Sequence, residues 1–153
     1  MDKQIKFLIR VDRSVKPSYT NWFRWFKKLM HPELELTGPA EYDLQTEVEE
    51  WLHDDQKSGP VLGQVIYDHF KKNNALADQL GLVDLLAIQA KGIKVFRKLY
   101  QGKVVFGWKS VIELRGGDLF VPCLYEGGGR VVLGWRWLDS HWLSHRPALR
   151  FRK

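Results

Sequence analysis

Carboxylates are concentrated in one part of this sequence. Residues 32–60, which we call the acidic strip, carry nine carboxylates and a single basic residue, Lys57. Carboxylates that converge beside a histidine can bind a divalent metal ion, which generates hydroxide from bound water and neutralises a leaving oxygen. The sequence therefore holds the ligand types of a metal-dependent phosphodiesterase or nuclease, at His31, Glu33, Asp43, His53, Asp54 and Asp55.

The spacing of these residues argues against a metal site. It matches no nuclease motif, and a run of carboxylates is more often a solvated face or a partner of basic residues. The order His31, His53-Asp54, Asp118 is that of metal phosphohydrolases, but their sites lie on helices and Asp118 falls in a glycine turn. We expect no cofactor. The acidic strip is more typical of a surface that binds a protein partner or a second copy of the chain.

Basic residues dominate the rest of the chain. The net charge outside the acidic strip is +14, against −8 within it, and the total is +6. Basic surfaces attract polyanions. No catalytic motif stands out, so we predict a non-enzymatic binding module for RNA or DNA. The predicted phosphate contacts are the stripe Lys91, Lys94 and Lys98, followed by Arg136, Arg150 and Arg152.

Residues 76–92 have some features of the helix-turn-helix motif of DNA-binding proteins. Small and apolar residues occupy the packing positions around Gly81. The positions that would face the bases include Val83, Asp84 and Leu85, which offer almost no hydrogen-bond donors in that orientation. A helical hairpin capped by Gly81 is the favoured interpretation.

Aromatic residues give a second hypothesis for nucleic-acid binding. Exposed aromatic rings beside arginine can stack on single-stranded bases. One face of the segment that begins at Arg130 carries Val131, Leu133, Trp135 and Trp137. A face of this kind is more typical of a strand covered by helices, so we expect it in the core, with Arg136 more exposed. Cys123 is expected to be a buried, unreactive thiol.

Hydrophobic periodicity predicts the elements that position these residues. A buried strand is expected over residues 4–11 and an amphipathic helix over residues 19–30, capped by Ser18. Residues 31–60 form an acidic connecting region, which the sequence leaves open as a strand pair or a short helix.

The remainder of the chain is predicted to be helical and then extended. Helices are expected over residues 61–73 and 83–100 within a helical middle, 61–100. Period-two alternation and two glycine turns, at 115–117 and 127–129, predict a Trp-rich antiparallel meander over 104–152. The fold class is therefore α+β.

Length and composition limit the class of protein. The 153 residues fit one domain, 1–153, with a sizeable core. No apolar run approaches the ~20 residues of a membrane-spanning helix, so we expect a cytoplasmic protein with no membrane partner. The single Cys123 excludes an intrachain disulfide framework.

Several segments in combination carry a resemblance to other proteins. They are IKFLIRVDRSVKPSY, HPELELTGPAEYDL, WLHDDQ, VFGWKS, FVPCLYEGGGRVVLGWRWLD and PALRF. With these segments the chain resembles a group of small uncharacterised bacterial proteins from uncultured lineages, which have no established function. The resemblance implies an independent, single-domain, cytoplasmic bacterial protein. It implies no activity and no catalytic residue.

Overall fold

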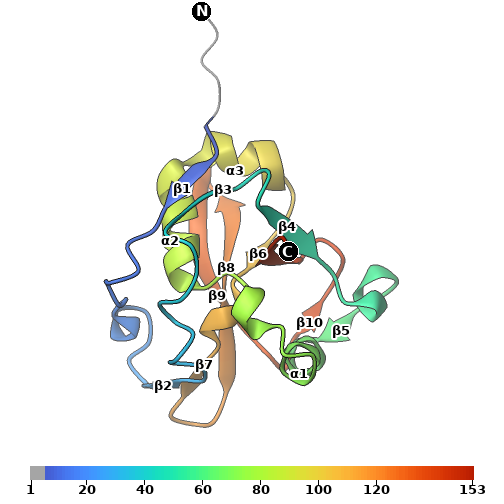
Figure 1. The fold of residues 1–153 in the computed structure, drawn as a ribbon. Helices are drawn as coiled ribbons and strands as arrows, with labels where there is room; N and C mark the ends of the chain where they lie inside the picture. Colours follow the sequence, from blue (N-terminus) through green and yellow to red (C-terminus); the bar gives the residue numbers. More distant parts are fainter. Residues whose placement is uncertain (1–5) are drawn as a thin grey trace, which may run out of the picture.

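The structure, a computed structural model, describes residues 6–153 and has a mixed α+β fold, as predicted (Figure 1). Its helices are α1 (Gly63–Lys72), α2 (Leu82–Lys91) and α3 (Ile93–Tyr100). Its strands are β1 (Leu8–Arg10), β2 (Phe26–Leu29), β3 (Glu41–Asp43), β4 (Val48–Trp51), β5 (Val61–Leu62), β6 (Val105–Phe106), β7 (Ile112–Leu114), β8 (Leu119–Gly127), β9 (Arg130–Trp137), β10 (His141–Trp142) and β11 (Ala148–Phe151). Short 3-10 helices lie at Tyr19–Asn21, Asp54–Lys57, Leu76–Asp78 and Trp108–Ser110.

A seven-stranded sheet is built around the long hairpin of β8 and β9. β9 pairs with β8 along its length on one side. On the other side, β8 pairs with β7 near its beginning and with β6 further along, so the sheet divides at β8. One branch continues from β7 to β2, and the other runs from β6 through β11 to β4. Two antiparallel ribbons, β1 with β3 and β5 with β10, complete the strand pairing.

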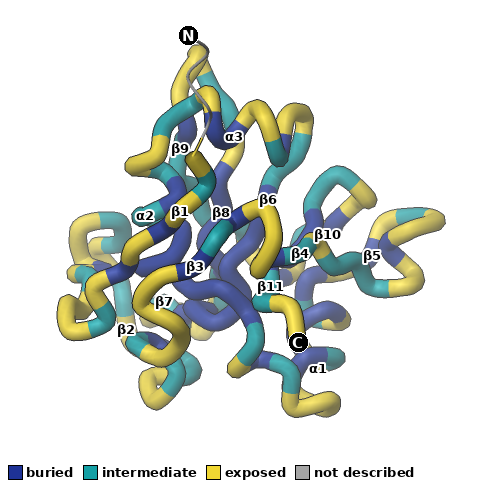
Figure 2. The backbone as a smooth tube through the Cα atoms, turned by 45° about the horizontal axis from the view of Figure 1, so that its top comes forward, coloured by how far each residue is buried: buried dark blue, intermediate teal, exposed yellow. Residues whose placement is uncertain are grey.

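The buried residues occupy the centre of the molecule, and exposed ones surround them (Figure 2). One cluster lies where α2 and α3 cover the β8–β9 hairpin, and it includes Ile88, Phe96 and Leu124. A second cluster surrounds Trp108 and Trp142 and includes the buried face of α1. In a third, Tyr19 and other aromatic residues pack on Trp135.

The predicted helix over residues 19–30 is wrong. The chain forms a single 3-10 turn at Tyr19–Asn21, and Ser18 precedes it without a side-chain capping bond. Phe26–Leu29 then form the edge strand β2, which pairs with β7. Aromatic residues are good strand formers, and helical spacing in a short aromatic run does not distinguish the two structures. The available edge of β7 decides the outcome.

The helical middle is largely as predicted. The helix expected over 61–73 is α1, which begins at Gly63 because β5 precedes it. The helix expected over 83–100 is divided into α2 and α3. Gly92, at the break, has φ 94°, a backbone angle that glycine adopts easily and other residues rarely do. The lysine stripe therefore spans two helices.

The strand predictions hold in part. Of the strand expected over residues 4–11, β1 covers three residues, and residues 4 and 5 lie outside the described part. Both glycine turns join neighbouring antiparallel strands, β7 to β8 and β8 to β9. The meander over 104–152 is less regular than predicted, since β11 runs parallel to β6 and β10 pairs with β5. The acidic connecting region contains the strands β3 and β4, which pair with β1 and β11 and not with each other.

Candidate functional site

Much of the acidic strip faces basic residues of the same chain. Glu49 of β4 lies opposite Arg150 of β11 and contacts the guanidinium groups of Arg150, at 3.4 Å, and Arg152, at 3.9 Å. Glu50 accepts a 2.8 Å hydrogen bond from Lys103. Glu41 contacts Arg10 at 3.3 Å, across the β1–β3 ribbon. Arg150 and Arg152, two of the predicted phosphate contacts, thus have a carboxylate neighbour that competes with any external phosphate.

The six residues considered as metal ligands do not form one cluster. In residues 6–153, no three His, Cys, Asp or Glu side chains are grouped so that they could hold a metal ion. His31 Nε2 lies 2.5 Å from the Tyr67 hydroxyl, and its Nδ1 lies 3.8 Å from Glu33. Asp43 instead accepts bonds from the backbone of the following turn.

The remaining three candidates are used at a helix start. His53 caps the 3-10 helix Asp54–Lys57, and its Nδ1 accepts a hydrogen bond from the Asp55 amide. Asp54 pairs with Lys57 at 3.2 Å. These contacts account for His53, Asp54 and Asp55 as local structure.

The three predicted lysines, Lys91, Lys94 and Lys98, are exposed on α2 and α3. Two further exposed basic residues, Lys6 and Arg10, line one groove with Lys91, and we call these five residues the lysine face. The inner side of α3 buries Val95, Phe96 and Tyr100, which directs Lys94 and Lys98 outward. Within residues 6–153, Lys91, Lys94 and Lys98 have no carboxylate within 4.0 Å.

A groove of about 420 Å³ runs between β1 and α2 at the lysine face. It is lined by the basic side chains of Lys6, Arg10 and Lys91 and by the apolar side chains of Leu8, Ala87 and Ala90. Of the three basic residues, Arg10 has a carboxylate neighbour, Glu41. Small side chains on α2 leave the groove open, while the three basic groups surround it.

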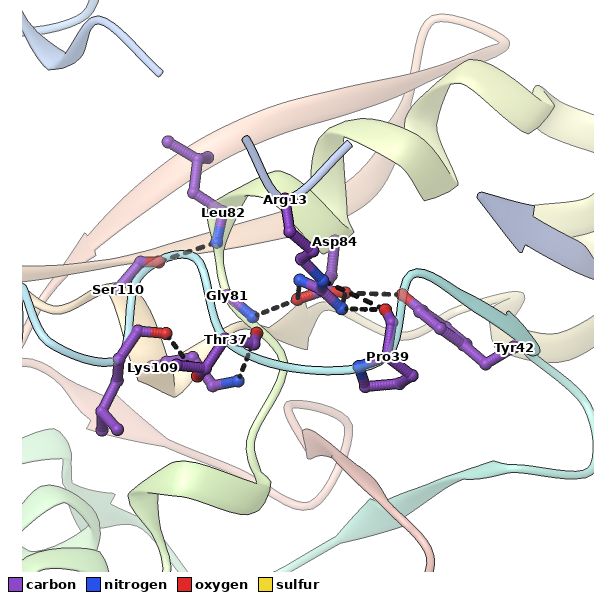
Figure 3. A network of polar contacts seen from close by, with 10 residues as sticks. Arg13, Thr37, Pro39, Tyr42, Gly81, Leu82, Asp84, Lys109 and Ser110 are labelled. Atoms are coloured by element: carbon purple, nitrogen blue, oxygen red, sulfur yellow. Dashed lines mark hydrogen bonds and ion pairs between the residues drawn. The ribbon is translucent and has the colours of Figure 1, made fainter. Parts of the chain in front are cut away.

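A network of buried polar groups fixes the beginning of α2 (Figure 3). Asp84, fully buried, accepts bonds from the Gly81 amide at 2.9 Å and the Tyr42 hydroxyl at 2.8 Å. Arg13 donates two further bonds to the same carboxylate, at 2.9 and 3.2 Å, and also binds the Pro39 carbonyl. A carboxylate in the first turn of a helix also interacts favourably with the helix dipole. Both oxygens of the Asp84 carboxylate therefore accept hydrogen bonds from groups of the same chain.

Glu35, the second buried carboxylate, lies nearby and is linked to the same helix start. The hydroxyls of Tyr19 and Ser110 donate to its two oxygens, and Ser110 Oγ in turn accepts from the Leu82 amide at 2.7 Å. Burial raises the pKa of Glu35, although both hydroxyls and the charge of Lys109 oppose that shift. Burial likewise lowers the pKa of Lys109, whose ammonium donates to the Thr37 carbonyl at 3.2 Å.

The Trp-rich segment is mostly core. Trp108 and Trp142 are buried, and the Trp135 ring contacts Tyr19, Trp22 and Phe23. Trp137 departs from the prediction, with 43% of its surface exposed at the end of β9. Cys123 is buried, as predicted, and burial raises its thiol pKa to about 12, so the reactive thiolate is not formed near neutral pH.

Arg136 is half-buried and not the exposed group expected from the sequence. Its guanidinium lies 5.1 Å from the centre of the Trp142 ring, and it donates to the His141 carbonyl at 2.6 Å. Arg146, which the sequence does not place among the predicted phosphate contacts, donates to the same carbonyl oxygen at 2.9 Å. No sequence signal pairs these two residues, because the loop between β10 and β11 brings them together.

Comparison with family models, with curated proteins and with solved structures found no match to this chain. The resemblance to small bacterial proteins therefore remains a prediction from the sequence segments that carry it. Within the described residues, no helix is both long enough and apolar enough to cross a membrane.

Proposed function

We propose that this chain binds the phosphate backbone of RNA or DNA through the lysine face. The observation that carries the proposal is the difference in partners among the basic residues. Arg150, Arg152 and Lys103 contact carboxylates of the acidic strip, whereas Lys91, Lys94 and Lys98 have none within residues 6–153. An external polyanion is the natural counter-charge for these lysines.

The chemistry of the lysine face favours binding that does not depend on base sequence. Lysine ammonium groups act as point charges toward phosphates and do not read the pattern of base edges as paired donors and acceptors do. The groove offers alanine and leucine side chains, which have no hydrogen-bonding groups for bases. Affinity should therefore come mainly from counterion release and fall steeply with salt.

Two other functions considered from the sequence have less support. A metal-dependent phosphodiesterase needs converging ligands, and the six candidates are engaged in separate local contacts. A partner-binding role for the acidic strip needs free carboxylates, and Glu41, Glu49, Glu50 and Asp54 contact basic residues of their own chain.

The test is fluorescence anisotropy with a labelled RNA and a labelled DNA of unrelated sequences, over a series of salt concentrations. We expect the logarithm of the binding constant to fall linearly with the logarithm of salt concentration. The double variant Lys94→Gln/Lys98→Gln should bind more weakly and reduce that slope by about two, because each substitution removes one lysine–phosphate interaction.

A matched control removes the same charge elsewhere. Lys27 and Lys28 are exposed and both lie near Glu113, at 3.6 and 3.8 Å. Lys27→Gln/Lys28→Gln lowers the net charge equally and should leave the slope nearly unchanged. An equal loss in both double variants would show that net charge, and not the lysine face, causes binding. Binding that is absent or insensitive to salt would refute the proposal.

A further inference from the structure

A cleft of about 310 Å³ opens on the face of the β8–β9 hairpin that carries Arg136, beside β6 and the loop before β11. It shares no residue with the lysine face. The residues that matter for its chemistry are Val104, Phe106, Cys123, Tyr125, Arg136 and Arg146. One part of the lining is apolar or aromatic, and the other carries two guanidinium groups. A volume of this size is in the range of small-molecule sites in proteins.

The two arginines place positive charges side by side without a carboxylate. Both guanidinium groups lie within hydrogen-bonding distance of one oxygen atom, the His141 carbonyl. In residues 6–153, neither has an Asp or Glu within 4.0 Å. Burial lowers the pKa of Arg136, and the neighbouring charge of Arg146 lowers it further.

Arg136 also retains an unused hydrogen-bond donor. Its Nε is buried and, among the residues that the structure describes, has no partner, while its guanidinium plane is held near the ring of Trp142. The contacts with Trp142 and His141 keep the side chain in place before a ligand arrives.

Tyr125 forms the aromatic wall of the cleft. Its ring lies across Gly134, where an added Cβ would come within 2.9 Å of the ring and 3.4 Å of Cys123 Sγ. The absence of a side chain at Gly134 therefore lets the ring lie close to the strand. Tyr125 is 37% exposed, so one side of it remains free for a planar group.

We propose that this cleft binds a phosphate monoester whose organic part is about the size of a nucleoside, with Arg136 and Arg146 on the phosphate and Tyr125 beside the base. Two guanidinium groups match a dianion, and arginine binds phosphate oxygens in a planar, two-pronged geometry. The shared chemistry fits two sources, a free nucleotide and the phosphorylated 5′ end of a nucleic acid strand. This proposal does not depend on the lysine face.

The first experiment is isothermal titration calorimetry of the full chain with adenosine 5′-monophosphate and with adenosine. We expect the nucleotide to bind at least about tenfold more tightly, since the nucleoside cannot form the charged hydrogen bonds to the phosphate. Equal affinities, or no binding of the nucleotide at millimolar concentration, would overturn the proposal.

Variants locate the site. Arg146→Gln should weaken nucleotide binding about tenfold or more, while Arg115→Gln, an exposed arginine outside the cleft, should leave it unchanged. If Arg146→Gln does not fold, Arg146→Lys keeps the charge and should still bind more weakly than the native chain. Tyr125→Ala should weaken binding of the nucleotide and leave binding of inorganic phosphate unchanged. Equal effects of Arg115→Gln and Arg146→Gln would contradict the assignment.

A second arm distinguishes the two sources of phosphate. Short oligonucleotides with and without a 5′-phosphate are compared in the native chain, so that any binding through the phosphate backbone is common to both strands and cancels in the comparison. Tighter binding of the phosphorylated strand than of both the unphosphorylated strand and the free nucleotide identifies the strand end as the ligand. Equal binding of strand end and nucleotide identifies the nucleotide. If the phosphate makes no difference to strand binding and the nucleotide does not bind, the proposal is wrong.

Discussion

Two regions of this molecule hold partly buried arginine side chains. The regions differ in whether a carboxylate balances the positive charge. At the beginning of α2, Arg13 contacts the buried carboxylate of Asp84, and each group satisfies the other. In the cleft beside β9, Arg136 and Arg146 share one carbonyl oxygen and, within residues 6–153, have no carboxylate. Burial alone therefore does not distinguish the two regions. What distinguishes the cleft is positive charge that the protein leaves without a counter-charge.

The largest loss of stability is expected at the beginning of α2. Asp84→Asn leaves Arg13 partly buried without its anion and weakens the acceptor of the Gly81 amide, so it should lower the free energy of unfolding by about 3–5 kcal/mol. Urea denaturation measures this loss. Glu41→Gln, which breaks the exposed pair with Arg10, is the control and should cost at most about 1 kcal/mol. Similar losses in the two variants would show that the buried pair of Arg13 and Asp84 contributes no more to stability than an exposed pair.

A smaller effect is expected from pH at the same region. Burial raises the pKa of Glu35 above its ordinary value of 4.5, so the native state holds this proton more tightly than the unfolded chain. The contribution of Glu35 is therefore most favourable below pH 4.5 and declines as the pH rises through the native pKa. Glu35→Gln cannot titrate at this position. As the pH rises, the free energy of unfolding of the native chain should therefore fall relative to that of the variant, by up to ~1.4 kcal/mol per pH unit.

Urea denaturation of both proteins at a series of pH values from 4 upward measures this difference. Titrating groups that do not interact with Glu35 contribute equally in both chains and cancel in the comparison, while Lys109 interacts with Glu35 and is an exception. Parallel stability curves would show that Glu35 ionises as easily in the folded state as in the unfolded chain.

The smallest effect is expected in the cleft. Arg146→Gln removes one of two like charges and leaves no carboxylate unpaired, so the free energy of unfolding in the absence of ligand should change by less than ~1 kcal/mol. Thermal and urea denaturation provide the measurement. A loss as large as that of Asp84→Asn would mean that Arg146 is a structural group, and the contrast between the two regions would fail.

Local signals predict the elements that depend on local chemistry. Helix α1 follows from its apolar spacing, and the β8–β9 hairpin follows from alternation on either side of three glycines. The false helix over residues 19–30 and the missed strand β2 within it have the same cause, because β2 forms by pairing with the distant β7, which no local pattern contains. The division between α2 and α3 is missed for another reason, since a single glycine such as Gly92 is also tolerated within a helix.

The candidate sites also contain some residues that local spacing predicts and others whose contacts depend on distant segments. Spacing on helices predicts Lys91, Lys94 and Lys98, and they are exposed there. Charge alone predicts Arg150 and Arg152, and the register of β11 on β4 gives them Glu49 as a neighbour. The pair of Arg13 and Asp84 joins residues 71 positions apart, and no local pattern connects them.

The place of β11 within the sheet has a consequence for how the molecule is made. β11 lies between β6 and β4, so these two strands cannot be joined until residues 148–151 are available. As the polypeptide is synthesised, β4 has to wait for a partner that lies far along the sequence. Pairings between such distant segments slow folding and expose unpaired strand edges in the meantime. Newly made chains should therefore be most vulnerable to aggregation or to chaperone capture through β4, just before translation reaches β11.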